Sequence, residues 1–315
     1  MCAKSLSIGT RGSPLALAQA HEVRDLLLAE ASKEAVELNI DIVVLKTTGD
    51  KIQDRPLAEV GGKGLFTKEL ERALFDKEID LAVHSMKDVA TVLPDGLKIV
   101  SVLEREDPRD VLISEKYKSL DDMPSGAIIG SASLRRQAMI LSKRPDLKVT
   151  LFRGNVQTRL SKLRDGLADA TLLALAGLNR LGQPELATEI LSPEKMLPAV
   201  AQGAIGIEIR SDDGFAYYWS LKLNHEETAT VVKAERALLR GLDGSCRTPI
   251  AGHAVIDGGE LVLKAWAAWP DGTNSLSSKI VGAPEEAEQL GLNLARSMRD
   301  ELGQAFFDQL ETEGR

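Results

Sequence analysis

Cysteine, histidine and aromatic residues are all scarce in this chain of 315 residues. The only cysteines are Cys2 and Cys246, so a disulfide framework is excluded and a reducing compartment, the cytoplasm, is expected. The four histidines are scattered, and no spacing of cysteine and histidine resembles a zinc site, so we expect no metal. The sequence also lacks the apolar runs of a membrane span or a secretory signal, so no membrane partner is expected.

Charge is distributed unevenly along the chain. The formal net charge is −8, but the segment from Ser131 to Arg164 holds nine basic residues and one acid, so it carries +8 and the remainder carries −16. Such segregation indicates an anionic ligand. Nucleic acid fits poorly, because Phe152 is the only aromatic residue in this basic segment and single-strand binders stack bases on several. Small ligands with several carboxylates or phosphates fit better, since arginine pairs with them bidentately.

The first hundred residues have the pattern of βα units. Apolar periodicity predicts strands over 6–10, 39–47 and 79–84, and helices over 14–30 and 65–77. Ser13 is placed to cap the first helix, with Pro14 at its first position. Parallel strands joined by crossover helices carry their functional loops at the strand carboxyl ends, where Arg11, Lys63, Lys87 and Asp88 are expected.

The rest of the chain predicts two further domains. Strands are expected over 127–130, 149–152 and 170–175, and helices over 134–142 and 155–164, while a strand over 204–210 would return to the first domain. From about residue 225 the pattern becomes a helix, then strands interrupted by glycine and proline, then a final helix from Pro284. We therefore expect an α/β domain made of residues 1–104 and 199–222, a second of residues 109–198, and a small α+β domain of residues 223–315.

Several residues are candidates for chemistry, each with a simpler alternative. Lys87-Asp88 pairs a base with an acid where α/β sites lie, although such a pair is commonly a surface ion pair. Arginines beside Gly or Ser turns favour ligand binding over a solvated basic face. Cys246 lies in a glycine-flanked loop beside Arg247, which would lower its thiol pKa, but an inert thiol is the alternative. His84, on an apolar strand, is expected to be a buried core histidine with a satisfied partner.

Taken together, these segments resemble the porphobilinogen deaminase (hydroxymethylbilane synthase) family over nearly the whole chain. The matching motifs are Gly9–Ala16, Thr47–Asp50, Gly61–Phe66, His84–Asp88, Arg105–Asp110, Ser133–Arg136, Arg153–Val156, Leu197–Val200 and the loop around Cys246. The resemblance implies two α/β domains like those of type-II periplasmic binding proteins with a cleft between them, and a small C-terminal α+β domain. It also implies a monomeric transferase of tetrapyrrole (haem) biosynthesis.

The resemblance implies a role for each matching residue. A dipyrromethane cofactor would be attached through a thioether to Cys246, and four porphobilinogen molecules would be added to it before hydroxymethylbilane is released by hydrolysis. The implied catalytic residues are Asp88, Lys87 and Arg11. The implied cofactor ligands are Cys246, Lys87, Asp88, Ser133, Arg135 and Arg136. The implied substrate and product ligands are Arg11, Ser13, Lys63, Arg153, Asn155, Arg159, Arg180 and Gln202.

Some features stand outside this assignment. Lys143, Arg144, Lys148, Lys162 and Arg164 are expected to be solvated. Ala201 occupies a position where the family usually has glycine. Two alternatives stay open from sequence: a non-catalytic anion-binding protein of the same two-domain architecture, which would give Cys246 no role, and a nucleic-acid-binding regulator.

Overall fold

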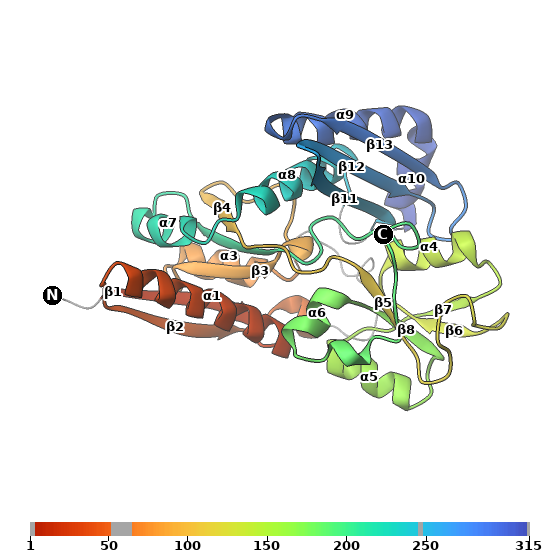
Figure 1. Ribbon diagram of the computed structural model, residues 1–315, viewed down its shortest axis with the longest axis horizontal. Coiled ribbons are helices and arrows are strands. Elements are labelled where there is room, and N and C mark those ends of the chain that lie inside the picture. The colour runs from red at the N-terminus through yellow and green to blue at the C-terminus, as the bar shows by residue number, and fades with distance from the viewer. Residues whose placement is uncertain (1–3, 52–64, 245–247, 314–315) are drawn as a thin grey trace. The chain divides into compact units, whose positions relative to one another are not determined.

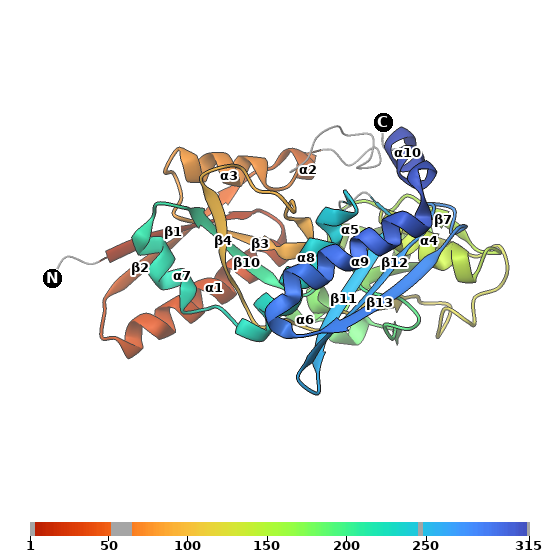
Figure 2. The ribbon, with the colours of Figure 1, turned by 90° about the horizontal axis from the view of Figure 1, so that it is seen from above.

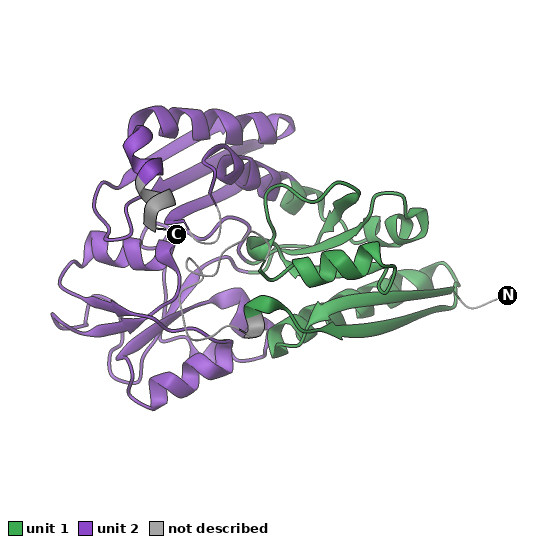
Figure 3. Cartoon of the chain, turned by 180° about the vertical axis from the view of Figure 1, so that it is seen from behind, with its two compact units in different colours: residues 1–52, 62–106, 203–229 green, residues 53–61, 107–202, 230–315 purple. Residues whose placement is uncertain are grey.

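The computed structural model describes residues 4–51, 65–244 and 248–313 (Figures 1 and 2). The chain divides into two compact units (Figure 3). The first consists of residues 1–52, 62–106 and 203–229, and the second of residues 53–61, 107–202 and 230–315. Within the described ranges, no helix combines the length and apolarity that crossing a membrane requires.

The first unit is built on a five-stranded sheet. Its strands are β1 (Lys4–Arg11), β2 (Leu38–Leu45), β3 (Leu81–Ser85), β4 (Leu97–Val102) and β10 (Ile205–Arg210). They lie in the order β2-β1-β3-β10-β4, with β1 parallel to β2 and β3. Strand β10 is antiparallel to both of its neighbours. The predicted return of the chain to the first sheet after residue 204 is therefore confirmed.

Helices cover both faces of this sheet. Helices α1 (Pro14–Lys33) and α7 (Gly214–Leu221) pack on one face, where Val23, Leu27 and Trp219 join the apolar core. Helix α3 (Lys68–Phe75) packs on the other face through Leu70 and Leu74. A single turn, α2 (Thr48–Lys51), follows β2. The expected helix over 65–77 is thus real but shorter at both ends.

The second unit contains a five-stranded sheet of the same topology. Its strands are β5 (Asp110–Ile113), β6 (Ile128–Gly130), β7 (Lys148–Thr150), β8 (Ala170–Ala174) and β9 (Glu189–Ile190). They lie in the order β7-β6-β8-β5-β9, with β6 parallel to β7 and β8, and β5 antiparallel to β8 and β9. In both sheets a parallel trio is followed by an antiparallel strand, so the two sheets share one topology.

The helices of this second sheet also lie on both faces. Helix α4 (Leu134–Lys143) packs on one face, where Ala138, Met139 and Ile140 are buried. Helices α5 (Val156–Arg164) and α6 (Leu175–Arg180) pack on the other through Leu163 and Leu178. A short turn, η3 (Pro184–Leu186), precedes β9.

The remaining part of the second unit is a three-stranded antiparallel sheet covered by helices. Strands β11 (Ile250–Asp257), β12 (Glu260–Ala267) and β13 (Leu276–Gly282) lie in chain order. Helices α8 (Glu226–Gly241), α9 (Ala287–Leu302) and α10 (Gln304–Glu313) accompany them, and a turn, η4 (Pro284–Glu286), leads into α9. Trp266 of β12 also joins the core beneath α4. The α+β character expected after residue 225 is confirmed, whereas the boundary between the second and third predicted domains stays a prediction.

Candidate functional site

The predicted catalytic residues of the first unit meet at one end of its sheet. Arg11 is the last residue of β1, and Lys87 and Asp88 belong to the turn η2 (Met86–Asp88) directly after β3. Because β1 and β3 are parallel neighbours, their carboxyl ends lie side by side. Arg11 Nη1 lies 3.9 Å from Asp88 Oδ2, and both side chains are partly exposed, at 22% and 28%. Arg11, Lys87 and Asp88 therefore share one polar, solvent-accessible strand end.

Arg11 is also held over an aromatic ring. Its guanidinium carbon lies 4.1 Å from the centroid of the Phe66 ring, which is within the range of a cation–π contact. Phe66 follows the glycine-rich segment that contains Lys63. Lys63 itself lies outside the described residues.

Gln19 is a residue of this site that the sequence reasoning missed. Its side chain, 5% exposed on α1, exchanges hydrogen bonds with the Ser85 hydroxyl: Nε2 lies 2.9 Å and Oε1 3.0 Å from Oγ. Ser85 is the residue before the η2 turn, so Gln19 ties α1 to the start of the Lys87-Asp88 segment. A polar side chain in the apolar stripe of a helix was the available signal, because Ala16, Ala20 and Val23 are buried beside it.

Three residues that the resemblance assigned to ligand binding are helix N-caps. The Ser13 hydroxyl accepts a hydrogen bond from Ala16 N at 3.2 Å, and the Ser133 hydroxyl accepts from Arg136 N at 3.4 Å. The Asn155 Oδ1 accepts from Thr158 N at 2.9 Å. Each cap satisfies a backbone donor that the first turn of a helix leaves unpaired. Ligand binding by the three residues stays a prediction.

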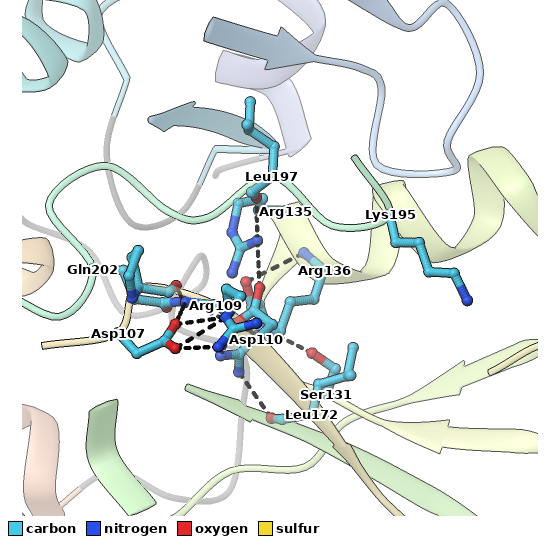
Figure 4. Close-up of polar contacts among 12 residues, drawn as sticks. Asp107, Arg109, Asp110, Ser131, Arg135, Arg136, Leu172, Lys195, Leu197 and Gln202 are labelled. Carbon is cyan, nitrogen blue, oxygen red and sulfur yellow. Dashed lines mark hydrogen bonds and ion pairs between the residues drawn. The ribbon is translucent and has the colours of Figure 1, made fainter. Parts of the chain in front are cut away.

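In the second unit, Arg135 and Arg136 converge on a buried carboxylate, Asp110 (Figure 4). Arg135 Nη1 lies 2.7 Å from Asp110 Oδ2, and Arg136 Nη2 lies 2.7 Å from Oδ1. Asp110 is completely buried, and the two arginines are 4% and 5% exposed. The arginines also donate to the carbonyls of Leu197 and Leu172, at 2.7 and 2.9 Å. The cluster carries two positive charges and one negative charge, so it keeps a net charge of +1.

The Asp110 carboxylate is strongly stabilised in its ionised form. Burial by itself would raise the pKa of Asp110, but the charges and hydrogen bonds of Arg135 and Arg136 outweigh burial and hold the pKa well below its usual value. One of the two arginine charges is thus neutralised within the protein.

Gln202, expected to bind substrate, instead takes part in this cluster. Its Nε2 donates to the Pro108 carbonyl at 2.7 Å and to Asp110 Oδ1 at 2.9 Å, and the residue is 1% exposed. A side-chain amide has two N–H donors, and both are used in these bonds. Gln202 therefore helps to hold Asp110, and its binding of substrate stays a prediction. The preceding residue, Ala201, has φ of 58°, which explains why glycine is usual there.

The remaining predicted cations of the second unit lie on loops and helix ends. Arg153 lies between β7 and α5 and is 6% exposed, and Arg159 Nε donates to the Gly154 carbonyl at 3.0 Å, which holds its guanidinium at the same loop. Arg180 ends α6, the helix that directly follows β8. These arginines lie on the carboxyl side of β7 and β8.

The prediction of solvated side chains holds for part of the basic segment. Lys148 and Arg164 are exposed, and Lys143 is exposed although its Nζ donates to the Glu194 and Lys195 carbonyls, both at 2.8 Å. Arg144 and Lys162 are partly exposed and are also bonded within the protein. Arg144 donates to two carbonyls and pairs with Asp146, and Lys162 Nζ donates to the Arg153 carbonyl at 3.0 Å. These two cations stabilise local structure.

Cys246, the expected attachment residue, lies outside the described residues, as do its neighbours Ser245 and Arg247. His84 is a buried core histidine with a partner, as predicted. It is 5% exposed, and its Nε2 lies 2.9 Å from Glu208 Oε2. Within the ranges that the structure describes, no group of three or more His, Cys, Asp and Glu side chains is arranged to hold a metal ion.

Two five-stranded sheets of the same strand order, with cations on loops at their strand ends, define a mixed α/β protein with a repeated sheet topology. Two family models match the chain: "Porphobilinogen deaminase, dipyromethane cofactor binding domain" over residues 6–217, and "Porphobilinogen deaminase, C-terminal domain" over residues 229–300. The chain belongs to the porphobilinogen deaminase family.

Curated relatives agree over nearly the whole length. The protein named porphobilinogen deaminase from Nitrobacter hamburgensis is 54% identical, with 96% of this chain and 95% of that protein covered. Its namesake from Paracoccus denitrificans is 50% identical, with 96% of each chain covered. The chloroplastic porphobilinogen deaminase of Oryza sativa is 52% identical, with 97% of this chain and 86% of that protein covered.

Proposed function

We propose that this chain is a porphobilinogen deaminase, a transferase that joins four porphobilinogen molecules head to tail with loss of ammonia and then releases hydroxymethylbilane by hydrolysis. The observation that carries the proposal is the match to relatives of that name at 50–54% identity over nearly the full length. The site at Arg11, Lys87 and Asp88 supplies the charged groups that such a reaction needs. This supports an enzyme over the non-catalytic anion-binding alternative.

The chemistry of the second unit fits a dipyrromethane cofactor, whose two pyrrole rings carry four carboxylates. The family model for residues 6–217 is named for this cofactor. The cluster of Arg135, Arg136 and Asp110 keeps a net charge of +1 at the amino end of α4, which suits a carboxylate. We propose that Ser133, Arg135 and Arg136, together with Lys87 and Asp88 of the first unit, hold the cofactor and that Cys246 attaches it. When bound, dipyrromethane supplies the pyrrole carbon to which the first porphobilinogen is joined.

Asp88 is proposed to act on the substrate. Loss of ammonia from porphobilinogen leaves a methylene-pyrrole cation, and a carboxylate beside the pyrrole N–H stabilises that positive charge. An ion pair of 3.9 Å with Arg11 is longer than a hydrogen bond, and a carboxylate has several acceptor positions. Asp88 therefore retains the capacity to accept a hydrogen bond from a pyrrole N–H while Arg11 and Lys87 bind substrate carboxylates.

The growing product needs many more cations. Each porphobilinogen adds an acetate and a propionate, and removing carboxylates from water is costly unless each one is paired. We propose that Arg11, Ser13, Lys63, Arg153, Asn155, Arg159 and Arg180 bind these groups. Each charge-assisted hydrogen bond contributes about 1.5–3 kcal/mol.

We further propose that the protein works as a monomer in the cytoplasm, with no nucleic-acid partner. The scarcity of cysteine and of aromatic residues supports the compartment and the lack of nucleic-acid binding.

The function is tested by measuring the stoichiometry of the purified protein acting on porphobilinogen. We expect four porphobilinogen molecules to be consumed and four ammonia molecules to be released for each hydroxymethylbilane. If porphobilinogen is bound without any release of ammonia, the protein is an anion-binding protein and the proposal fails.

The proposed role of Arg159 in α5 predicts a defect in elongation. Arg159→Gln should slow later additions about 10- to 150-fold, the loss of one charge-assisted hydrogen bond, and should therefore accumulate enzyme-bound intermediates. Intact-protein mass spectrometry during turnover would show these as discrete mass steps. The matched control is Arg164→Gln, which removes an exposed arginine from the same helix and should elongate normally. Equal rates in both variants would indicate a solvated basic face.

A further inference from the structure

A polar pair lies buried between the sheet of the first unit and α3, beside apolar side chains of this layer. His84 Nε2 of β3 lies 2.9 Å from Glu208 Oε2 of β10, and the two residues are 5% and 0% exposed. The surrounding residues of this layer include Leu70, Leu74 and Ala82. Two ionisable side chains in such a place require a mutual interaction, because each alone would lose its hydration without replacement.

Strand register explains how the two side chains meet. Strand β10 runs antiparallel to β3, with Gly206 opposite His84 and Glu208 opposite Ala82. His84 and Glu208 are therefore diagonal neighbours on the same face of the sheet, within reach of long side chains. The pair links the carboxyl end of β3 to the middle of β10.

The same strand also fixes the turn that follows His84. Met86 N donates to the Ala204 carbonyl at 3.0 Å. The Met86 side chain is 2% exposed and packs against Gly206, where an added Cβ would lie 2.0 Å from the sulfur atom. The backbone of the residue just before Lys87-Asp88 is thus held by Ala204, the residue that precedes β10, and its side chain packs against Gly206 of β10.

Among the described residues, no second hydrogen-bond partner of the Glu208 carboxylate could take the place of His84. Its Oε1 is buried and has no hydrogen-bond partner in the part of the chain that the structure describes. The other acid facing the pair is Glu71 of α3: burial raises the pKa of Glu71, and the charge of Glu208 raises it further, while His84 lowers it. Among the described residues, the hydrogen-bond partner of the Glu208 carboxylate is therefore His84.

We propose that the His84–Glu208 pair is a positioning element of the catalytic turn: it fixes the carboxyl end of β3 and thereby the placement of Lys87 and Asp88. The expected effect on catalysis rests on the proposed function, whereas the expected effect on the structure of the turn does not. Without the pair, the end of β3 is held less tightly. A misplacement of about 1 Å at a reacting group costs on the order of 100-fold in rate.

The test compares two substitutions of one residue. Glu208→Leu removes the partner of His84, and we expect kcat to fall on the order of 100-fold with KM changed only a little. Glu208→Gln keeps a hydrogen-bond acceptor of the same shape and should retain most of kcat. The matched control is Arg210→Lys, a buried position on the same strand and the same face. Its partners, the carbonyls of Leu74 and Ile79 and the carboxylates of Asp80 and Asp213, do not belong to the catalytic turn. It should lower the melting temperature but not kcat.

A second measurement does not depend on activity. Hydrogen–deuterium exchange of a peptide covering Met86 to Val89 should be faster in Glu208→Leu than in the wild type, and unchanged in Glu208→Gln and Arg210→Lys, because the Met86 amide donates to the carbonyl of Ala204, directly before β10. If Glu208→Leu does not fold, His84→Leu, which has no hydrogen-bonding group for Glu208, replaces it with the same expectations. Normal exchange of this peptide, or a kcat equal to that of the wild type, would overturn the proposal. Failure of the wild type to consume porphobilinogen, with exchange as expected, would overturn only the proposed function.

Discussion

Replacing Asp88 with asparagine should lower turnover of porphobilinogen by about 10²- to 10⁴-fold, the range expected for loss of a positioned acid–base group, while substrate still binds. Asparagine has nearly the same shape, so the turn η2 and its place beside Arg11 should be kept. What is lost is the negative charge that stabilises the substrate cation, together with the ability to take up a proton.

Rapid-quench measurement of ammonia release in Asp88→Asn would give the chemical rate, and equilibrium binding of porphobilinogen would show that the site is intact. A suitable control is Asp76→Asn, which removes an aspartate of the same unit that pairs with Arg72 at 3.2 Å on the exposed end of α3. That variant should react like the wild type. Turnover at the wild-type rate in Asp88→Asn would remove this carboxylate from the mechanism.

Replacing Asp110 with alanine should cause the largest loss of stability. Two arginines that are 4% and 5% exposed would lose the carboxylate that both contact at 2.7 Å. Breaking a buried ion pair from one side costs about 3–5 kcal/mol, because a buried charge is left without compensation. Urea unfolding should therefore show a much lower midpoint for Asp110→Ala.

The pH dependence of stability provides a second readout for Asp110. Because the pKa of Asp110 is lowered in the folded protein, the unfolded chain takes up this proton first as pH falls. The stability that Asp110 contributes is thus fully present above the ordinary carboxyl pKa of about 3.9 and is lost as pH falls below it. Asp110→Ala should lack this part of the acid dependence.

Asp146→Ala is the matched control, because Asp146 also lies 2.7 Å from an arginine, Arg144, but the pair is at the surface. Exposed pairs contribute little, so its urea midpoint should stay close to that of the wild type. Similar midpoints for Asp110→Ala and Asp146→Ala would contradict the assignment of Asp110 as the buried centre of the second unit.

Much of the fold followed from local patterns in the sequence. Asn155 caps α5 as its position before the periodic segment predicted, and the strand after Ala204 does return to the first sheet. Caps and periodicity act over a few residues, which is why the sequence shows them directly. Helix ends were less accurate, as for α3, because tertiary packing determines where a helix stops.

The partners of the charged side chains could not be predicted in the same way. Arg135 and Arg136 were assigned to an external anion, but both pair with Asp110. The arginines lie on α4, which follows β6, whereas Asp110 lies on β5, two places from β6 in the sheet. Gln202 and Gln19 likewise find their partners through long-range packing. A charge pattern indicates the sign of a ligand, whereas the fold determines how much of that charge is already neutralised.

The measurement that tests the account most directly is the intact mass of the purified protein. We expect the wild-type mass to exceed that of the polypeptide by one dipyrromethane and Cys2→Ala to keep this excess. Cys246→Ala should have the mass of its polypeptide and no activity. An active enzyme without the added mass, or a Cys246→Ala variant that retains it, would contradict covalent attachment at Cys246.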